Sequence, residues 1–353
     1  MSVPDPSLSL NSGLPKLGWS AYWAELARGA AGARPARVIR EDRARCLVHT
    51  GEDAVHAGYA GALDPAPTTG DWVLLDPGGA IATVLPRRTA LRRGAGKSEA
   101  KDQVLAANVD VVGVVHGLSA APSLGRIERL TTLAWSSGAQ PVVILTKADL
   151  ATSPQSEREE VQAACPGAEV VCVSVDPAHP DHAGLGEIRR LLPAGTTGTF
   201  AGPSGVGKSS LVNALAGRDL LATGEIRADG KGRHTSVTRE LVALPWGAVV
   251  IDTPGLRGVQ LWDAEDGLDA AFADIAELAA QCRFADCQHR TEPGCAVLAA
   301  IADGSMSQRR LDSHDRLQRE QNWLASRYDA RLRAEQKAKW KALHKQMRGH
   351  NRQ

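Results

Sequence analysis

The sequence predicts a multi-domain protein with an N-terminal β-barrel, a central α/β domain and a C-terminal helical domain. Three observations support this. Residues 36–95 form short β-type segments separated by turn residues, strands alternate with helices in residues 104–276, and cysteines crowd together in residues 277–353 before a charged helical tail. Residues 1–35 are expected to be a partly ordered leader.

Composition allows several domains and points to a charged tail. The chain has 353 residues with 43% hydrophobic content, enough for two or three domains with real cores. The formal net charge is only +1, but from Met306 onward thirteen Lys or Arg face five Asp or Glu (+8), leaving 28 against 35 (−7) elsewhere. A basic tail on an acidic body suggests a polyanionic partner, although a solvated helix face would have the same composition.

Targeting signals are not visible in the sequence. Residues Met1–Gly13 are rich in Ser and Pro and lack a basic segment followed by an apolar core. We find no run approaching the roughly 18 apolar residues that a membrane span needs. We therefore expect a cytoplasmic protein without a membrane partner, in a compartment where disulfides are rare.

The N-terminal barrel is predicted from short β segments without a long helical period. A turn is expected at residues 76–79. The predicted strands are Arg37–Arg40, Ala44–His49, Asp71–Leu75 and Ala80–Leu85.

The central domain is predicted from strands that alternate with helices, which indicates a mostly parallel sheet covered on both faces. The expected strands are Val109–Val115, Pro141–Leu145, Glu169–Val175, Thr197–Ala201, Glu240–Pro245 and Ala248–Asp252. The expected helices are Arg126–Ser137, Ser156–Ala164, Leu185–Leu192, Ser210–Ala216 and Asp269–Ala280, with a tail helix from about Ser313.

A phosphate-binding loop is the strongest motif. It matches G-x-x-x-x-G-K-[ST] at every fixed position, after a strand and before a helix. The glycines let backbone N–H groups surround a phosphate at the positive helix end. We expect Lys208 to reach the β- and γ-phosphates as a catalytic group, and Ser209 to ligate Mg²⁺. The predicted phosphate-binding residues are Gly202, Pro203, Ser204, Gly205, Val206, Gly207, Lys208, Ser209 and Ser210.

A guanine-reading motif follows a buried strand at Thr146, Lys147 and Asp149. A carboxylate at the carboxyl end of a strand can accept hydrogen bonds from N1–H and the exocyclic amine of guanine, a donor pair that adenine lacks. The segment resembles the [NT]-K-x-D motif of GTPases. Ser174, at the end of the next predicted strand, is a candidate for the loop that packs on the base.

A switch motif is predicted at Asp252 and Gly255, directly after another strand. It resembles the D-x-x-G motif of GTPases, in which Asp252 would hold Mg²⁺ and the Gly255 N–H would contact the γ-phosphate. A plain strand-ending turn is the alternative, since Pro254-Gly255 is a common turn pair.

The order of these motifs predicts a circular permutation. Common GTPases carry the phosphate loop first and the base-reading motif last, whereas here Thr146–Asp149 precedes Gly202–Ser209. A site built from loops at one sheet edge keeps its geometry when the chain order changes.

A metal site is predicted in the C-terminal segment. Three thiols and one imidazole form a full set of four ligands for a structural Zn²⁺, with no open position for catalysis. Three buried cysteines and a surface histidine are the alternative. The predicted ligands are Cys282, Cys287, His289 and Cys295.

The combined motifs resemble the small ribosomal subunit-dependent GTPase A family, RsgA/YjeQ, from about Ala36 to the tail. Further matches are Leu105–Asp110 and Gly232–Thr235. The resemblance implies an OB-fold barrel, a circularly permuted GTPase domain and a zinc domain. It also implies binding of GTP/GDP and of the small (30S) ribosomal subunit and its rRNA, GTP hydrolysis stimulated by that subunit, and a role in its late maturation. We expect a monomer.

The catalytic details are hypotheses. The position after Gly255, where many GTPases place a water-orienting Gln, holds Leu256. His234 is our candidate for positioning or activating water, with RNA contact as its alternative role. Thr235 is preferred to Thr238 as the switch hydroxyl for Mg²⁺.

Other functions stay open at this stage. Four arginines of the predicted barrel, Arg37, Arg40, Arg43 and Arg45, could meet RNA phosphates or be solvated charges. A P-loop kinase or ATPase would leave two motifs unexplained. A nucleotide-gated RNA-binding factor with incidental turnover would suit Leu256. A permuted GTPase acting on the large subunit would leave the barrel and the cysteine cluster without a role.

Overall fold

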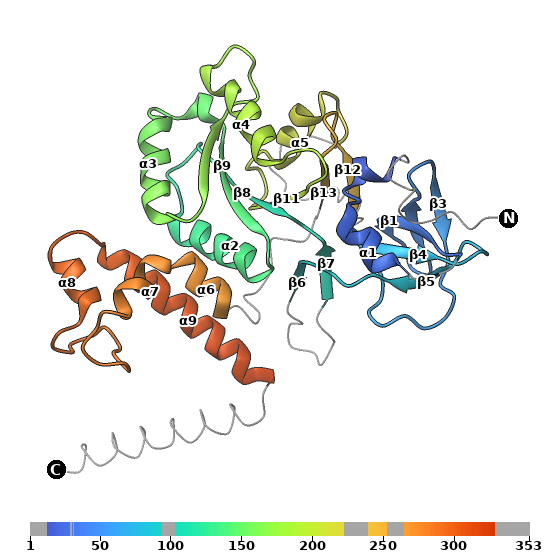
Figure 1. The fold of residues 1–353 in the computed structure, drawn as a ribbon. Coiled ribbons are helices and arrows are strands. Elements are labelled where there is room, and N and C mark those ends of the chain that lie inside the picture. The colour runs from blue at the N-terminus through green and yellow to red at the C-terminus, as the bar shows by residue number, and fades with distance from the viewer. Residues whose placement is uncertain are drawn as a thin grey trace, which may run out of the picture.

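The computed structural model describes residues 13–28, 30, 32–93, 103–221, 239–252 and 265–328. In this part of the chain three units follow one another: a β-sheet unit, a larger α/β unit and a helical unit (Figure 1). No helix in the described ranges is both long and apolar enough to cross a membrane.

The N-terminal unit is a five-stranded antiparallel sheet in the order β3-β2-β1-β4-β5. A parallel bridge between Tyr59 and Ile81 brings the segment after β3 onto β5. The cyclic order is therefore β1-β2-β3-β5-β4-β1, which makes a five-stranded, partly open barrel and confirms the expected OB-type fold. Its strands are β1 (Arg34–Glu41), β2 (Cys46–His49), β3 (Ala54–Ala57), β4 (Trp72–Leu75) and β5 (Ile81–Val84).

Residues before the barrel pack against it. The 3-10 helix η2 (Leu14–Leu17) and helix α1 (Ala21–Ala27) bury Trp19 and Trp23 beside Trp72 of β4, with ring centroids 4.8 and 6.1 Å apart. These three indoles, in edge-to-face and tilted contact, remove a large apolar area from water, so this part of the predicted leader is ordered by packing.

One of the predicted phosphate-binding arginines is instead a buried structural residue. Arg37 is only 2% exposed, stacks on Trp72, and donates to the Leu17 carbonyl and the Thr197 hydroxyl at 2.9 and 3.0 Å. Burial lowers the pKa of Arg37 to about 10. The prediction that Arg37 could meet RNA is therefore wrong: its side chain joins the barrel to the central domain.

A two-stranded ribbon, β6 (Ala90–Arg93) paired with β7 (Gln103–Ala107), connects the barrel to the central sheet. Neither this ribbon nor β3 was expected from the sequence. The central sheet has six strands in the order β10-β9-β8-β11-β13-β12, all parallel except β12, as expected from the strand-helix alternation. Its strands are β8 (Val111–Gly117), β9 (Gln140–Thr146), β10 (Glu169–Val173), β11 (Thr197–Ala201), β12 (Glu240–Ala243) and β13 (Val249–Asp252).

Helices cover both faces of this sheet. Alternate residues of its strands point to opposite faces, and each set belongs to its own apolar cluster. Val114 and Val143 face α2 (Leu124–Ser136) and α3 (Pro154–Ala164). Val115 and Ile144 face the opposite helices, α4 (Gly184–Leu191) and α5 (Lys208–Ala216) (Figure 1).

The C-terminal unit packs against α2. The predicted single helix at Asp269–Ala280 is two helices, α6 (Glu265–Ala271) and α7 (Ala273–Ala279), since the buried Phe272 leaves the helical conformation. Helices α8 (Ala296–Ala302) and α9 (Gln308–Tyr328) follow, and α9 starts five residues before the predicted Ser313.

A buried ion cluster fixes α9 to the central domain. Glu128 of α2, 1% exposed, accepts from Arg309 at 3.0 Å and from Arg310 at 3.2 Å. Arg310 also pairs with Asp274 at 2.8 Å and lies over the Phe272 ring. Because these charges are paired and hydrogen-bonded, none of them is left uncompensated by burial. The ion pairs also fix the orientation of α9 relative to α2.

Candidate nucleotide and metal sites

The candidate nucleotide site lies along the carboxyl edge of the parallel strands. Strands β9, β10, β11 and β13 end at Thr146, Val173, Ala201 and Asp252, and each is followed or closed by a predicted motif residue. The chain proceeds from β8 outward to β9 and β10, then returns to β11 on the other side of β8. This reversal of strand order is where open α/β sheets bind ligands.

The phosphate loop has the backbone shape that its glycines predict. Gly202, Gly205 and Gly207 all have positive φ, at 153°, 78° and 92°. A Cβ on Gly202 would lie 2.4 Å from the Val115 carbonyl oxygen, so only glycine fits where the loop leaves β11. Gly207 directly precedes α5, so the phosphate loop ends at the N-terminus of this helix. The helix N-terminus favours the binding of an anion.

Lys208 reaches back over the phosphate loop. Its ammonium donates to the carbonyl oxygens of Gly202 and Pro203 at 2.9 and 2.6 Å. Ser209 and Ser210 follow in the first turn of α5, and Ser204 is exposed at the loop's rim.

Asp252 ends β13 within the electrostatic reach of Lys208. Burial raises the pKa of the Asp252 carboxyl, the Lys208 ammonium opposes this rise, and Glu240 on the neighbouring strand adds to it. Such a partly desolvated carboxylate, together with the Ser209 hydroxyl in the first turn of α5, would offer oxygen ligands of the kind that a divalent cation prefers.

Thr146 joins the base-reading strand to the phosphate loop. Its side chain is buried and its hydroxyl contacts two carbonyl oxygens, that of Val206 in the loop and that of His116 at 3.2 Å. Thr146 thus supports the loop from below. The next residue, Lys147, has a left-handed conformation with φ 58°, and its side chain lies beside Gly117.

Asp149 and Ser174 are brought together across two strand ends. The Ser174 hydroxyl donates to Asp149 Oδ1 at 2.8 Å and accepts from the Asp176 N–H at 3.1 Å. Ser174 is fully buried, whereas Asp149 is exposed and carries the exposed Leu150 beside it. The serine therefore holds one carboxylate oxygen and fixes the direction of the other.

Replacing Thr146 by Val tests whether the Thr146 hydroxyl supports the phosphate loop. The change keeps the shape but leaves the buried Val206 carbonyl oxygen without its hydroxyl partner, which costs about 1–3 kcal/mol. We expect about tenfold weaker GTP binding in an equilibrium titration. Thr132→Val is the matched control, because Thr132 is also buried and bonds a carbonyl, that of Glu128, far from the loop; equal GTP affinities in the two variants would contradict this account.

Three predicted site residues, His234, Thr235 and Gly255, lie outside the described residues. Sequence reasoning missed Gly117, beside which the Lys147 side chain lies. It also missed the segment around His182, whose ring nitrogen Nδ1 lies 3.2 Å from the Ser174 carbonyl oxygen. None of these has a motif that could have indicated its role.

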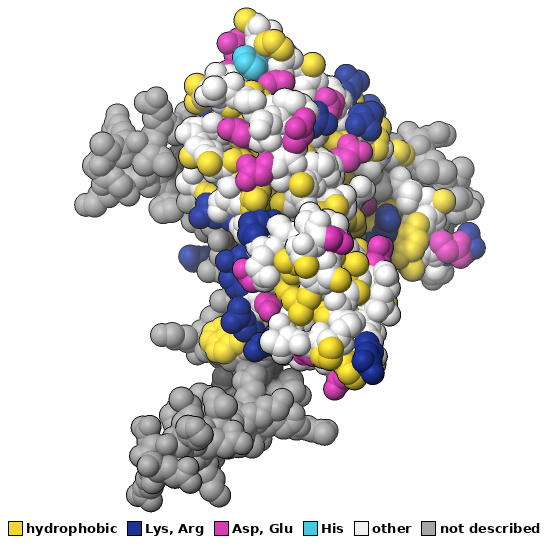
Figure 2. All heavy atoms as spheres, turned by 90° about the vertical axis from the view of Figure 1, so that its left-hand side faces the viewer, with side chains coloured by type: hydrophobic (Ala, Val, Ile, Leu, Met, Phe, Trp, Pro, Cys, Tyr) yellow, Lys and Arg dark blue, Asp and Glu magenta, His cyan; other side chains and the backbone are white. Residues whose placement is uncertain are grey.

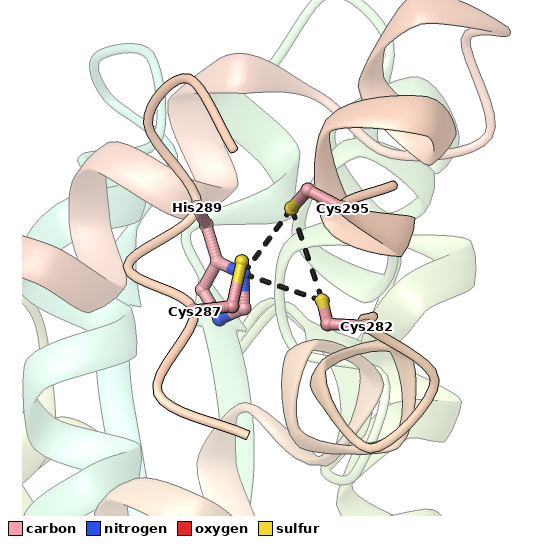
Figure 3. A group of neighbouring side chains, drawn as sticks. All are labelled: Cys282, Cys287, His289 and Cys295. Atoms are coloured by element: carbon pink, nitrogen blue, oxygen red, sulfur yellow. Dashed lines mark hydrogen bonds between the residues drawn. The ribbon is translucent and has the colours of Figure 1, made fainter. Parts of the chain in front are cut away.

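The four predicted metal ligands converge in the C-terminal unit. Their ligand atoms all lie within 4.8 Å of one another (Figure 3). Cys282 Sγ lies 3.7 Å from His289 Nδ1 and 3.8 Å from Cys295 Sγ, and the last two atoms are 3.4 Å apart. The left-handed backbone of His289, with φ 56°, turns its ring toward the sulfurs. The group could hold a metal ion.

Two thiols of this cluster, Cys282 and Cys295, lie beside backbone donors. Burial raises the pKa of Cys282, but hydrogen bonds from the Ala296 and Val297 N–H groups and from the neighbouring thiols together lower it, whereas burial raises the pKa of Cys287 to about 11. Cys295 caps α8 and accepts from the Leu298 N–H at 3.4 Å. Backbone donors at a helix start favour the thiolate, the form that binds metal.

Comparison with known proteins agrees with this geometry. The RsgA GTPase family profile matches residues 84–262. A protein of Streptomyces coelicolor named small ribosomal subunit biogenesis GTPase RsgA is 46% identical over 95% of this chain and 94% of its own length. A protein of the same name from Opitutus terrae is 40% identical over 96% of this chain and 98% of its own.

Solved structures show the same fold. The crystal structure of YjeQ from Thermotoga maritima is similar with a TM-score of 0.60 and 24% identity, over 81% of this chain and 97% of that one. The circularly permuted GTPase YloQ is similar with a TM-score of 0.59 and 23% identity, over 84% of this chain and 96% of that one. The family profile and the near full-length relatives show that the chain is a GTP-hydrolysing enzyme and belongs to the RsgA GTPase family.

Proposed function

We propose that this GTPase binds the small (30S) ribosomal subunit, assists its late maturation, and hydrolyses GTP to GDP and phosphate with turnover that the subunit stimulates. The observation that carries the proposal is the near full-length likeness to relatives named for small-subunit biogenesis. The permuted nucleotide site and the charged C-terminal unit fit the same role.

In this proposal, the carboxyl edge holds GTP in a fixed direction. Asp149, oriented by Ser174, reads the guanine edge, while residues Gly202–Ser210 surround the phosphates and Lys208 moves from its loop carbonyls to the β- and γ-phosphates. Ser209, Asp252 and Thr235 would hold Mg²⁺, which supplies charge neutralisation at the transferring phosphate. Gly255 would contact the γ-phosphate.

Water activation is assigned to His234. The residue after Gly255 is Leu256, which cannot orient water, so intrinsic turnover should be slow. A histidine can accept or donate a proton near neutral pH. We expect His234→Ala to lower subunit-stimulated kcat by about 10²-fold while GTP affinity stays unchanged.

The His234 prediction is measured by multiple-turnover phosphate release with saturating small subunits. His179→Ala serves as the comparison variant and should keep its stimulated kcat, because His179 only caps the 3-10 helix Pro180–Ala183. Stimulated turnover of His234→Ala equal to that of the unchanged protein would remove His234 from the mechanism.

The metal proposed for the C-terminal cluster is one structural Zn²⁺. A tetrahedral Zn²⁺ with Zn–S bonds of about 2.3 Å sets two sulfurs about 3.8 Å apart. The Cys282–Cys295 sulfur distance of 3.8 Å fits this spacing. Three thiolates and an imidazole also suit zinc better than hard cations such as magnesium.

RNA contact is proposed for a basic face formed where α9 packs against α2. Arg126 of α2 and Arg316 and Arg319 of α9 are exposed, and Arg316 lies over Gly125 at the start of α2. Trp323, one turn further along α9, is 51% exposed. Figure 2 shows Lys and Arg side chains gathered along the lower left of one face of the molecule. Arginines beside an exposed aromatic ring suit RNA phosphates and unstacked bases.

The remaining proposals follow from this partner. We place the protein in the cytoplasm, where small subunits mature, and as a monomer. Co-sedimentation with purified small subunits tests the partner directly. The protein should sediment with the subunits in the presence of a non-hydrolysable GTP analogue and be released in the presence of GDP. If the amount of protein in the pellet is the same with and without subunits, in both nucleotides, the assignment is rejected.

A further inference from the structure

The segment between β10 and α4 forms a compact structure around one residue of the nucleotide site, Ser174. Every polar group of Ser174 is bonded. The hydroxyl donates to Asp149 Oδ1 at 2.8 Å and accepts from the Asp176 N–H at 3.1 Å, and the backbone N–H donates to the Asp181 carbonyl at 3.2 Å. The remaining group is the Ser174 carbonyl oxygen, which lies 3.2 Å from His182 Nδ1.

The chemistry of this last contact fixes its direction. A carbonyl oxygen can only accept, so Nδ1 of His182 carries the proton and donates. The imidazole is half-buried in the 3-10 helix η4 (Pro180–Ala183), directly before α4. Among the side-chain hydrogen bonds of the described residues, the one from His182 alone reaches the backbone of Ser174.

The surrounding chain leaves this arrangement little freedom. A Cβ on Gly184 would lie 2.1 Å from the Cys172 carbonyl oxygen, so the backbone of α4 begins in direct contact with β10. Ser174 itself is fully buried. A shift of the Ser174 peptide would therefore move its hydroxyl and the carboxylate that the hydroxyl holds.

We infer that His182 is a positioning residue for guanine selectivity, acting through Ser174 on Asp149. The inference rests on the proposed role of Asp149 as the reader of the guanine edge. His182 would act without touching the nucleotide, through its contact with the Ser174 carbonyl oxygen. It fixes the Ser174 peptide, so that the serine hydroxyl holds one carboxylate oxygen and directs the carboxylate at the base.

The test is the ratio of affinities for GTP and inosine triphosphate, which lacks only the exocyclic 2-amino group. Equilibrium titrations of the full-length protein with each nucleotide give this ratio. A carboxylate that is no longer held should lose much of its charge-assisted bond to that amine, so His182→Ala should lower the GTP preference about fivefold. A general loss of folding would lower both affinities together and leave the ratio unchanged.

Matched variants separate positioning from loop stability. His182→Asn should restore the ratio, because its amide can donate from near the position of Nδ1. His179→Ala should leave the ratio unchanged, because His179 caps the same 3-10 helix through the Asp181 N–H without contacting Ser174. In a double mutant with Ser174→Ala, the effect of His182→Ala should vanish, since both act on one carboxylate.

Two results would overturn the inference, and they are distinguishable. If Asp149→Ala lowers the GTP preference and His182→Ala does not, then His182 has no positioning role although Asp149 reads the base. If Asp149→Ala itself leaves the preference unchanged, then the assignment of Asp149 fails and the role of His182 fails with it.

Discussion

Lys208→Ala is expected to reduce GTP hydrolysis by about 10²- to 10³-fold, the usual effect of removing one preorganised charge from a transferring group. The Lys208 ammonium lies at the mouth of the phosphate loop, where it donates to two loop carbonyls at 2.9 and 2.6 Å. Those neutral acceptors hold the charge where the β- and γ-phosphates are expected.

The same substitution should weaken cation binding. Burial raises the pKa of Asp252, and the Lys208 ammonium opposes this rise. Without that charge the carboxyl titrates at still higher pH, so Mg²⁺ must compete with a proton over a wider pH range. We therefore expect the Mg²⁺ concentration needed for half-maximal turnover to increase, most clearly at acidic pH.

Steady-state phosphate release with varied Mg²⁺ measures both effects. Lys16→Ala is the control, because Lys16 is an exposed lysine of η2 in the N-terminal unit. Turnover of Lys208→Ala within a factor of two of the unchanged protein would contradict the proposed phosphate site.

Removing the metal ligands Cys282 and Cys295 together, as serines, should unfold the loop between them and destabilise α7 and α8, while sparing the nucleotide site. Structural zinc supplies on the order of 10 kcal/mol to small folded units, and α8 begins at one ligand. The loop from Cys282 to Cys295 contains no helix or strand of its own. Without metal, little holds this loop in place.

Metal analysis and hydrogen exchange measure the outcome. The double variant should lose about one equivalent of zinc, and amides of α7 and α8 should exchange faster, while those of β8, β9 and β11 keep their protection. Cys165→Ser is the control, since Cys165 is buried at the end of α3 and belongs to no possible metal-binding group among the described residues. A double variant that retained its zinc, or the protection of α8, would exclude a structural metal at this position.

Features set by a few neighbouring residues were predicted well from the sequence. The parallel sheet, both faces of helices and the family were confirmed, because strand runs and the phosphate-loop pattern are local signals. The metal ligands also come together as expected, since they lie within fourteen residues of one another.

Features that depend on distant contacts were not predictable. Arg37 has the sequence context of a surface arginine, but its partners Thr197 and Asn108 come from 160 and 71 residues away. Thr146 binds a carbonyl 60 residues further along the chain. The break at Phe272 follows from packing of that ring under Arg310. No local pattern carries such information, because tertiary contacts outweigh local propensity.

The most direct test of the central claim is GTP hydrolysis, measured beside ATP hydrolysis, with and without purified small ribosomal subunits. The account predicts slow turnover of GTP alone, a steep increase with the small subunit, no such increase with large subunits, and no comparable turnover of ATP. GTP turnover that small subunits leave unchanged would contradict the proposed ribosomal role, and turnover of ATP in place of GTP would contradict the assignment of Asp149.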